Sequence, residues 1–366
     1  MKKRVALIAS TLEGFGLVKM MYYLVKYINR DRFSVYIVTL SPEPENSYKR
    51  EFEKLGVKVL SIGKSRLNGF FFASSALQKV ITSNKIDVVH SHGFRADLTV
   101  KNIKRKSFKW IITAHSDPDS EKKHFLGSYI DKWRRRTHIK IIKQNKNNVV
   151  AVSKSIQFRF RDLGVYISRI NNGIEVEQNV SSITNIEIKK KYSIPLDKKV
   201  CLVLSGLTKK KNIETIVSAF ASGNLSNYYL LIAGDGEEND NLQLLSGSRD
   251  NICFLGYVSN PTELFKISDF YLTASLFEGL SLSLLEAMSY GLIPVISLIP
   301  SHREVVENSI LENNCFDCFD WKRLIEILQS IEDGDMEIQS ALSKEIVRRH
   351  YHAKDMARFY EGYYQW

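Results

Sequence analysis

Two carboxylates lie close together in the sequence, Glu278 in a predicted turn and Glu286 eight residues on, within a short stretch of apolar residues at helical spacing. Buried-strand patterns precede the turn, over residues 270–275, and follow the stretch, over residues 292–297. The sequence therefore predicts a strand, a turn, a helix and a second strand. The apolar face of this helix is formed by Leu282, Leu285 and Met288. Gly291 and Pro294 then end it.

The predicted turn and the first turn of the helix can bind an anion. Gly279 lies in the turn, and Ser281 and Ser283 lie near the first helical turn. The first N–H groups of a helix have no partner inside the helix, and the helix dipole places positive charge at that end. A phosphate group is a natural occupant of such a site. One strand–turn–helix unit could thus hold a phosphate between Glu278 and Glu286.

The stretch EGLSLSLLEAMSYGLIPVI resembles the signature of the GT4-type (group 1) retaining glycosyltransferases, which have the GT-B fold. The resemblance implies that Glu286 binds the ribose of a nucleotide sugar and that Glu278 lies beside the transferred sugar. It also implies that the backbone amides between them, at Ser281 and Leu282, hold the diphosphate. An ordinary βαβ unit with acids on a solvated helix face is the alternative, which the spacing of the two acids alone would favour.

A second segment, SGLTKKKN, resembles the family's GRLxxxKN, in which Arg and Lys both bind the diphosphate. Lys211 matches the lysine, whereas Gly206 occupies the arginine position and so removes a bidentate partner for phosphate. The resemblance therefore implies that the diphosphate depends on Lys211, on Lys209 or Lys210, and on helix amides. Asn212 can cap the helix that follows. A solvated basic run is the alternative for these lysines.

Three further matches complete the predicted donor site. LGYVS resembles the family's LGxV, whose backbone surrounds the base, and this implies contacts from Tyr257 and Val258. IAGDGEE resembles the family's GxGxE turn. The loop at residues 11–16 resembles the Gly-rich loop after the first strand, with Gly16 in the second glycine position, where glycine lets the backbone approach a ligand closely. Simple turns at strand ends would explain the same residues.

Histidines stand at two predicted strand ends. His115 ends WIITAH, and His90 and His92 end DVVHSH, so all three should lie at the carboxyl ends of parallel strands, where ligands bind. The family often has a histidine near the transferred sugar, and the resemblance implies that role for His115, with His90 and His92 more structural. The DPD triplet at 117–119 looks like the metal clamp of another glycosyltransferase fold, but such triplets often occur by chance. We expect neither a metal nor another cofactor.

The order of the predicted elements defines an α/β fold. Strands and helices alternate along both halves, which predicts two doubly wound parallel sheets. The resemblance implies the GT-B architecture, two Rossmann-like domains with an interdomain cleft. We expect an acceptor-binding domain over residues 1–175, to which a last helix at 352–366 returns, and a nucleotide-sugar-binding domain over residues 176–351. The expected strands cover residues 5–10, 35–40, 57–62, 87–90, 110–114, 149–153, 168–171, 200–205, 228–233, 252–255, 270–275 and 292–297.

Composition and length indicate which class of protein this sequence belongs to. The 366 residues, with 44% apolar and 25% charged, are typical of a soluble globular chain long enough for two cores. No apolar run approaches the roughly 20 residues of a membrane-spanning helix, and the start, MKKRVALIAS, has too short an apolar run for a signal peptide. Cys315 and Cys318 form the single C-x-x-C, without a nearby histidine set, which argues against zinc and favours a reducing compartment.

Positive charge is concentrated in the first half. Residues 1–170 carry a net charge of +21 and residues 171–366 a net charge of −9. The three phenylalanines at 70–72 cannot share one helix face, and the segment at 122–144 mixes lysines and arginines with Trp133. A basic helix face over ordinary core contacts is one explanation. We expect instead an interfacial surface for anionic lipid, because enzymes of this family often act on lipid-linked sugars.

These features together predict a transferase. We expect transfer of a sugar from a UDP- or GDP-sugar to a hydroxyl of a saccharide linked to polyprenyl diphosphate, for cell-surface polysaccharide synthesis on the cytoplasmic face of the membrane. Retention of configuration is implied by the family. The alternatives are a nucleotide-sugar epimerase of the same fold, a nucleic-acid binder, and a non-catalytic protein whose donor site has decayed at Gly206. The epimerase motif lacks the two-acid pattern, and no segment resembles a nucleic-acid recognition module, so we expect no nucleic-acid partner.

Overall fold

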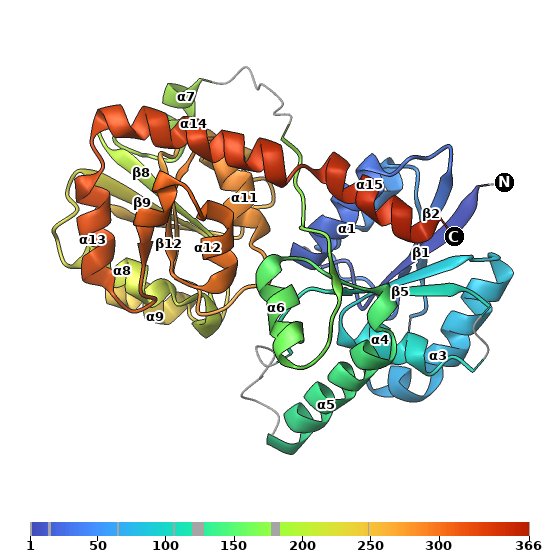
Figure 1. Ribbon diagram of the computed structural model, residues 1–366. Coiled ribbons are helices and arrows are strands. Elements are labelled where there is room, and N and C mark those ends of the chain that lie inside the picture. Colours follow the sequence, from blue (N-terminus) through green and yellow to red (C-terminus); the bar gives the residue numbers. More distant parts are fainter. Residues whose placement is uncertain are drawn as a thin grey trace. The chain divides into compact units, whose positions relative to one another are not determined.

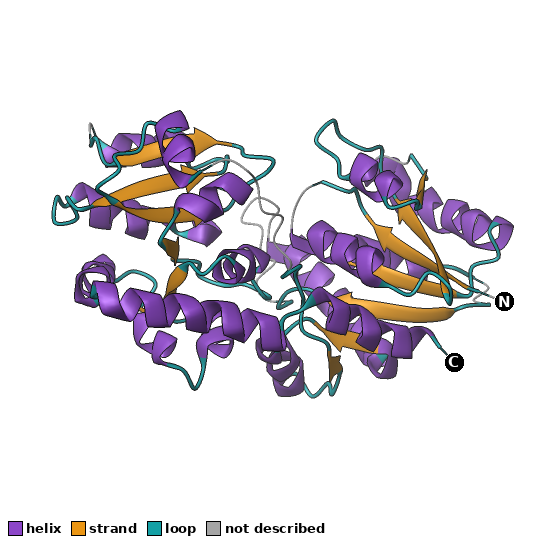
Figure 2. Ribbon diagram, turned by 90° about the horizontal axis from the view of Figure 1, so that it is seen from above, coloured by secondary structure: helices purple, strands orange, loops and turns teal. Residues whose placement is uncertain are grey.

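The computed structural model describes residues 2–13, 16–63, 66–104, 107–118, 128–176, 184–247 and 249–365, except for the side chains of residues 66–71 and 128. The chain divides into two compact units. Unit 1 comprises Met1–Ile174 and His352–Trp366, and unit 2 comprises Glu175–Tyr351. Each unit holds a parallel sheet between helices (Figure 1, Figure 2). In the described parts of the chain, no helix combines the length and apolar character needed to cross a bilayer.

The described sheet of unit 1 has seven strands in the order β3-β2-β1-β4-β5-β6-β7. Strand β1 lies in the middle, where Val5 pairs with Val35 on one side and with Val88 on the other, all in parallel. The sheet is wound outward in both directions from β1, and this places the carboxyl ends of β1, β4 and β5 along one edge. The strands are β1 Lys3–Ala9, β2 Phe33–Thr39, β3 Lys58–Ser61, β4 Val88–His92, β5 Lys109–Ala114, β6 Val149–Ala151 and β7 Ser168–Arg169.

The helices of unit 1 cover this sheet with apolar faces. In α1, Met20, Met21, Leu24 and Val25 are buried at helical spacing. Phe72, in α3, is exposed, and the other two phenylalanines of that run have side chains outside the described set. The helices are α1 Gly16–Tyr27, α2 Lys49–Lys54, α3 Arg66–Ser83, α4 Phe94–Lys101, α5 Ser128–Gln144, α6 Lys154–Asp162 and α15 Ala353–Tyr364.

The last helix, α15, belongs to unit 1 although it follows all of unit 2 in the sequence. The Ala353 N–H donates to the Ile174 carbonyl at 2.8 Å, and α15 then packs against α1. Gly173 allows this approach, because a Cβ atom there would lie 2.8 Å from the Ala353 backbone. Tyr360 and Tyr364 of α15 are fully buried.

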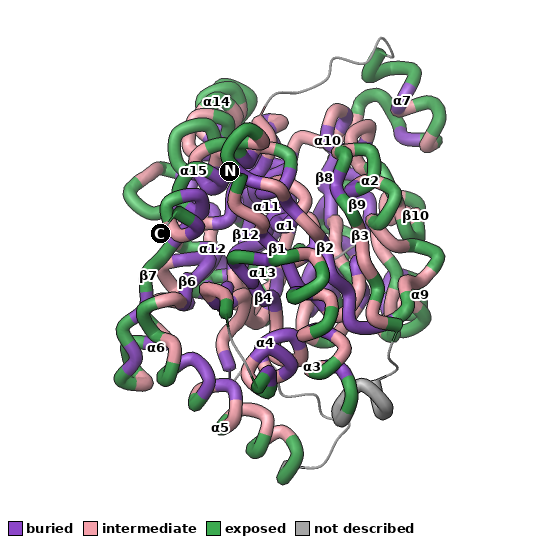
Figure 3. The backbone as a smooth tube through the Cα atoms, turned by 90° about the vertical axis from the view of Figure 1, so that its right-hand side faces the viewer, coloured by how far each residue is buried: buried purple, intermediate pink, exposed green. Residues whose placement is uncertain are grey.

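The sheet of unit 2 has six described strands in the order β10-β9-β8-β11-β12-β13, again parallel. The strands and the apolar faces of the helices that cover them form the buried core, and buried residues are purple in Figure 3. Phe220, Phe270 and Phe316 are among the largest side chains in it. The strands are β8 Lys199–Leu204, β9 Tyr228–Ala233, β10 Ile252–Gly256, β11 Phe270–Thr273, β12 Ile293–Ser297 and β13 Cys315–Phe316.

Helices of unit 2 follow each strand in turn. Helix α11 ends before Gly291, whose φ of +90° favours glycine, and a Cβ atom there would also run into Ser340 and Lys344 of α14. The helices are α7 Asn185–Lys191, α8 Ile213–Ala221, α9 Asn239–Ser246, α10 Thr262–Ile267, α11 Leu282–Ser289, α12 Pro300–Val306, α13 Trp321–Ser330 and α14 Asp333–His350. Short 3₁₀ turns occur at η1 Lys146–Asn148, η2 Lys209–Lys211 and η3 Ile310–Asn314.

The α/β class with two parallel sheets is confirmed. Every expected strand is present with small shifts at its ends, whereas β13 is an additional strand. β13 has only two residues, Cys315 and Phe316, and it joins the sheet through pairing with Ile296 and Ser297. All four cysteines are free thiols.

Candidate functional site

The carboxylate of Glu278 lies at the centre of the strand–turn–helix in unit 2. It forms an ion pair with Lys211 Nζ, and Ser275 Oγ donates to its Oε1 at 3.0 Å. Lys210 Nζ lies 3.9 Å from Oε2. The turn that carries both lysines is bound to the turn that carries the acid, because the Leu276 N–H donates to the Lys210 carbonyl at 2.9 Å. The fold thus brings together two predicted site residues, Lys211 and Glu278, that lie far apart in the sequence.

Glu278 is ionised at neutral pH. Burial alone would raise the pKa of its carboxyl group, but the attraction of Lys211 and Lys210 outweighs burial and lowers this pKa to about 2. Two ammonium groups around one carboxylate leave a net positive charge. The cluster can therefore attract an anionic ligand while Glu278 stays ionised.

Helix α11 begins directly after this turn. Ser281 is the N-cap residue, and its Oγ accepts from the Leu284 N–H at 3.4 Å. Ser283 Oγ lies 2.8 Å from the hydroxyl of Tyr271, which fixes the first turn against β11. The amides of Leu282 and Ser283 belong to the first turn, whose N–H groups have no carbonyl partner within the helix. These amides and the helix dipole are the groups that the sequence predicts for binding an anion, and the anion site stays a prediction.

Glu286 lies one turn further along α11 and is only 7% exposed. Its backbone carbonyl accepts from Ser289 Oγ at 2.7 Å, and this bond helps to end the helix. The side chain of Leu282 is packed in the core, so only its backbone can contact a ligand. Both features agree with the roles that the sequence predicts for these residues, which stay predictions.

Asn212 precedes α8 in a left-handed conformation, with φ of 48°, and its side chain makes no capping hydrogen bond. The predicted cap is therefore wrong. The side-chain amide instead donates to Thr215 Oγ1 at 3.0 Å and to the Cys318 carbonyl at 2.6 Å. These bonds use the Nδ2 group and tie Asn212, the residue after Lys211, to α8 and to the Cys318 backbone. The donor contact predicted for Asn212 stays a prediction.

The other predicted donor residues also lie at strand ends. Gly206 follows β8, and the nearest atom to a Cβ placed there would be the Asp235 carbonyl oxygen at 3.8 Å, so the position has room for a side chain. Tyr257, which is exposed, and Val258, which is half-buried, follow β10. Gly16 in unit 1 begins α1 and is exposed, whereas the preceding Gly-Phe pair lies outside the described residues.

The three histidines that the sequence places at strand ends form one connected cluster in unit 1. His92 Nδ1 lies 2.9 Å from His115 Nε2, and the rings of His90 and His92 are 4.2 Å apart between centroids. His90 is held on both sides, with Tyr364 OH 2.7 Å from Nδ1 and Thr113 Oγ1 2.6 Å from Nε2. The C-terminal helix therefore supports the residues behind His115. Because His115 uses Nε2 in this bond, its Nδ1 is the ring nitrogen left for a ligand.

All three imidazoles are neutral at physiological pH. Burial lowers the pKa of His90 to about 3, with a further contribution from His115, and burial lowers the pKa of His115 to about 3. Burial followed by repulsion from the other two rings places the pKa of His92 well below its ordinary value. A neutral His92–His115 pair shares a single proton between the two facing nitrogens.

We expect Tyr364→Phe to lower the free energy of unfolding of unit 1 by about 1–3 kcal/mol, because it leaves a buried nitrogen of His90 without its partner. Urea unfolding followed by hydrogen exchange in β4 measures this change. Tyr363→Phe is the matched control, since it removes the neighbouring hydroxyl and keeps the aromatic ring. Equal losses in both variants would contradict the role given to the Tyr364 hydroxyl.

The acidic triplet at 117–119 is only partly described. Asp117 accepts from Arg159 Nε at 3.0 Å, and Asp119 lies outside the described residues. Across the parts of the chain that the structure describes, no three His, Cys, Asp or Glu side chains are grouped as metal ligands.

Two family models match the chain, one for each unit. The model described as "Glycosyl transferases group 1" matches residues 184–349, and that described as "Glycosyltransferase Family 4" matches residues 16–178. The chain belongs to the group 1 glycosyltransferases. The family predicted from the signature around Glu278 is thereby confirmed.

Curated relatives of this glycosyltransferase are distant. The O-antigen biosynthesis glycosyltransferase WclY of Escherichia coli is 23% identical over 76% of this chain and 79% of its own length. The UDP-Gal:alpha-D-GlcNAc-diphosphoundecaprenol alpha-1,3-galactosyltransferase of Escherichia coli is 24% identical over 67% of each chain. The putative glycosyltransferase EpsD of Bacillus subtilis is 26% identical over 63% of this chain. The match spans 64% of EpsD and 62% of a Methanocaldococcus jannaschii relative, a little under two thirds of each.

Solved glycosyltransferase structures share the whole fold. Anabaena Alr3699/HepE, in complex with UDP and glucose, superimposes with a TM-score of 0.82 at 17% identity. The superposition covers 99% of this chain and 99% of that one. Sucrose-phosphate synthase of Thermosynechococcus elongatus superimposes with a TM-score of 0.81 at 16% identity, over 100% of this chain and 98% of its own. The fold of this glycosyltransferase is GT-B, as predicted.

Sequence reasoning missed one residue of this glycosyltransferase, His302. Its Nδ1 lies 3.1 Å from Ser297 Oγ and 3.2 Å from the Ser297 carbonyl oxygen. Because Ser297 Oγ donates to the Ser275 carbonyl at 2.8 Å, Nδ1 must carry the proton. Burial lowers the pKa of this imidazole to about 4, so it is neutral, and its Nε2 is a buried acceptor without a partner among the described residues. The network thus reaches Ser275, which donates to Glu278.

A signal for His302 existed in the sequence. It lies in α12, the helix that follows the buried strand predicted at 292–297. Segments that follow parallel strands lie at the carboxyl edge of the sheet, where ligands bind, so a histidine there was a candidate site residue.

Proposed function

We propose that this glycosyltransferase moves a sugar from a nucleotide diphosphate sugar, a UDP- or GDP-sugar, to a hydroxyl group of a lipid-linked saccharide with retention of configuration. The observation that carries the proposal is the Lys211–Glu278 pair at the start of α11, with Glu286 in the same helix. This arrangement supplies a cation and helix amides for a diphosphate and two carboxylates for hydroxyl groups.

Each residue has a definite part in the proposed chemistry. Lys211 and the first amides of α11 stabilise the charge that develops on the leaving diphosphate. Glu278 accepts from hydroxyls of the transferred sugar, and its low pKa keeps it ionised for this purpose. Glu286 accepts from the ribose hydroxyls. His115, through Nδ1, is proposed to contact the transferred sugar from unit 1.

Two named relatives and the surface of unit 1 support a proposal for the acceptor and for the place where the enzyme acts. One relative is named for transfer to a diphosphoundecaprenol-linked sugar and another for O-antigen biosynthesis. We propose a similar polyprenyl-diphosphate-linked acceptor on the cytoplasmic face of the membrane, with peripheral attachment to anionic lipid. Exposed Tyr129, Ile130 and Trp133 on the first turns of α5, together with the net charge of +21 over residues 1–170, support the attachment.

A donor screen tests the proposal. The purified chain is incubated with UDP-, GDP- and other nucleotide sugars, and transfer or slow hydrolysis is followed by release of the nucleotide diphosphate. Turnover of one donor class, with its sugar found on an added lipid-linked saccharide, is the expected result. Formation of an epimer without release of the diphosphate, or the absence of any nucleotide-diphosphate binding, would overturn the proposal.

Glu286→Ala is expected to weaken nucleotide-diphosphate binding by about 1.5–3 kcal/mol, because it removes a charged acceptor for the ribose hydroxyls and leaves a good helix former in α11. Titration calorimetry measures the change. Glu337→Ala, which removes an exposed acid from α14, is the control and should bind as the wild type does. Unchanged affinity in Glu286→Ala would contradict the ribose assignment.

Transfer is expected to continue in the presence of a metal chelator. The reason is that lysines and helix amides, rather than a pair of acids, face the proposed diphosphate position. The initial rate with excess EDTA should therefore equal the rate without it. A rate that falls to background with EDTA and returns with magnesium or manganese would show that a metal ion takes part.

A further inference from the structure

Helix α5 extends beyond the core of unit 1 and carries most of its cations outward. His138, Ile141 and Ile142 anchor its second half, whereas Tyr129 near its start is 85% exposed. Figure 1 and Figure 3 show the helix at the edge of the unit. One side of the middle and end of α5, next to the C-terminal end of α6, is therefore accessible to solvent.

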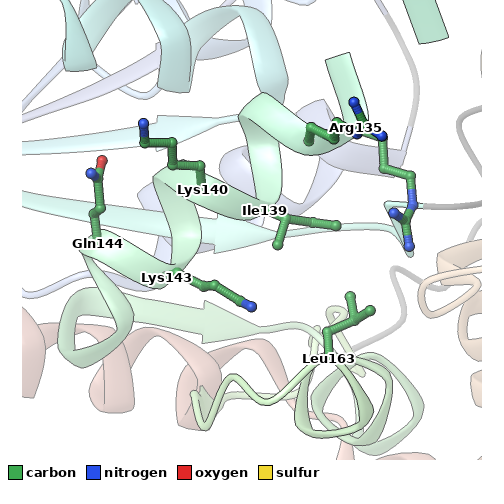
Figure 4. Close-up of a pocket in the computed structure, with 7 residues that line it drawn as sticks. Arg135, Ile139, Lys140, Lys143, Gln144 and Leu163 are labelled. Carbon is green, nitrogen blue, oxygen red and sulfur yellow. The ribbon is translucent and has the colours of Figure 1, made fainter. Parts of the chain in front are cut away.

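A groove of about 510 Å³ follows this accessible side of α5. Arg135, Ile139 and Lys143 lie on successive turns of one face and point toward Leu163, the residue that ends α6 (Figure 4). Its full lining is Arg135, Arg136, Ile139, Lys140, Lys143, Gln144 and Leu163. Four of these seven residues are cations and none is an acid.

The lining has two distinct chemical parts. Ile139, Leu163 and the methylene stems of the long side chains provide an apolar floor. The guanidinium and ammonium groups form the rim, and arginine is suited to the bidentate binding of phosphate. A free inorganic anion would use the rim alone. A molecule with a phosphate next to an apolar chain would use both parts.

We infer that the α5–α6 groove is a binding site for a single lipid phosphate, with the phosphate on the cationic rim and the start of the apolar chain on Ile139 and Leu163. The inference rests on the proposed membrane attachment for its setting, but it does not depend on the donor sugar or on the residues of unit 2. It also differs from general attraction to a charged surface, because a site discriminates between ligands of equal charge and saturates with one ligand for each chain.

The test uses dihexanoyl phosphatidic acid below its micelle concentration as the probe, with inorganic phosphate as the comparison. Titration is followed by amide chemical shifts of α5 and by calorimetry. We expect one bound lipid, bound more tightly than inorganic phosphate. In Lys140→Gln/Lys143→Gln the affinity should fall roughly thirtyfold, because each cation near an anionic group contributes about fivefold.

Two controls keep the test specific. Lys54→Gln/Lys79→Gln removes the same charge from exposed positions on α2 and α3 and should bind the lipid as the wild type does. Leu163→Ser keeps every cation and should reduce the preference for the lipid over inorganic phosphate. Turnover with a soluble acceptor should be unchanged in all of these variants, which separates failure at the groove from failure of the proposed transfer.

Three results would overturn the inference. Equal loss of affinity in the groove variant and in the Lys54/Lys79 control would mean general Coulombic attraction. Equal affinity for inorganic phosphate and for the lipid would mean that the apolar floor takes no part. Shift changes that map away from α5 and α6 would place the lipid elsewhere.

Discussion

Replacing Lys211 with Gln is expected to lower kcat for sugar transfer by on the order of 100- to 1,000-fold, the effect of removing one preorganised group that stabilises a developing negative charge. Lys211 is the cation that directly contacts Glu278 at the start of α11. Gly206 has no side chain that could also bind the diphosphate, although the position has room for one. The diphosphate therefore depends more on Lys211 than it would with an arginine beside it.

The same substitution should also alter Glu278. Without Lys211, only Lys210, 3.9 Å away, remains to offset burial, so the pKa of Glu278 should rise from about 2 toward its ordinary value. The loss of stability should be well below the 3–5 kcal/mol typical of a broken buried pair, because Lys211 is partly exposed and Lys210 stays. A moderate loss of stability with a large loss of rate is thus the expected combination.

Lys209→Gln is the matched control for this prediction. Lys209 lies in the same 3₁₀ turn and is exposed, so its loss removes equal charge at a distance from the carboxylate. Steady-state rates at saturating donor, together with thermal unfolding, compare the two variants. A Lys211→Gln rate within about threefold of the wild-type rate, or an equal loss in Lys209→Gln, would argue against the leaving-group role.

Much of the fold was predictable from the sequence because most strands are continuous apolar runs. β1, β8 and β9 are buried almost throughout, and such runs mark strands of a parallel sheet. β13 was not predictable, because a two-residue strand has no periodicity of its own. It exists only where β12 offers an edge for pairing.

The site was predictable in its residue types but not in its contacts. The signature around Glu278 identified the two acids and the helix start, but no pattern shows that Lys211, in a separate turn, pairs with Glu278. Asn212 was misjudged because its side-chain Nδ2 group donates to Thr215 Oγ1 and to the Cys318 carbonyl, and its side chain accepts no capping N–H from α8. The amide partners of Asn212, at Thr215 and Cys318, come together only in the folded unit.

The network behind His115 was likewise hidden from the sequence. Tyr364 reaches His90 from 274 positions further along the chain. Strand-end position alone predicted where the histidines lie, and it did not predict that they contact one another. Their mutual contact and burial arise only in the folded unit, where they make stability depend on pH.

Unit 1 is expected to lose several kcal/mol of its free energy of unfolding when the pH falls from 7 to 5. His90, His92 and His115 are neutral in the folded state, with pKa values of about 3 for His90 and His115 and well below the ordinary value for His92. In the unfolded chain each would titrate near its ordinary value, about 6.5. The unfolded state therefore binds more protons than the folded state throughout the window between about 6.5 and 3.

The sign of the effect follows from proton linkage. Where the unfolded state binds more protons, stability rises with pH, so the contribution of these histidines is complete above about 6.5 and is lost as the pH falls toward 3. At pH 5 the loss is roughly 2 kcal/mol for each fully buried histidine. His115 is half-buried and counts for less. The expected loss is a large part of the roughly 5–15 kcal/mol that stabilises a domain.

Unit 2 should be less sensitive in this pH window. It holds one histidine of this kind, His302, whose pKa burial lowers to about 4. Glu278 adds a loss of the same sign only at lower pH, between its ordinary value near 4.5 and about 2. Unit 1 should therefore unfold before unit 2 as the solution is acidified.

Hydrogen exchange at a series of pH values, corrected for intrinsic exchange rates, measures the two units separately through peptides from β4 and β5 and from β8 and β9. His92→Gln removes one titrating group from the cluster, so the slope of stability against pH should become shallower even though the variant is less stable at pH 7. His350→Asn removes an exposed histidine at the end of α14 and should leave the slope of unit 1 unchanged. If β4 keeps its full protection at pH 5, or if His92→Gln and the wild type show the same slope, the cluster does not hold neutral histidines against protonation.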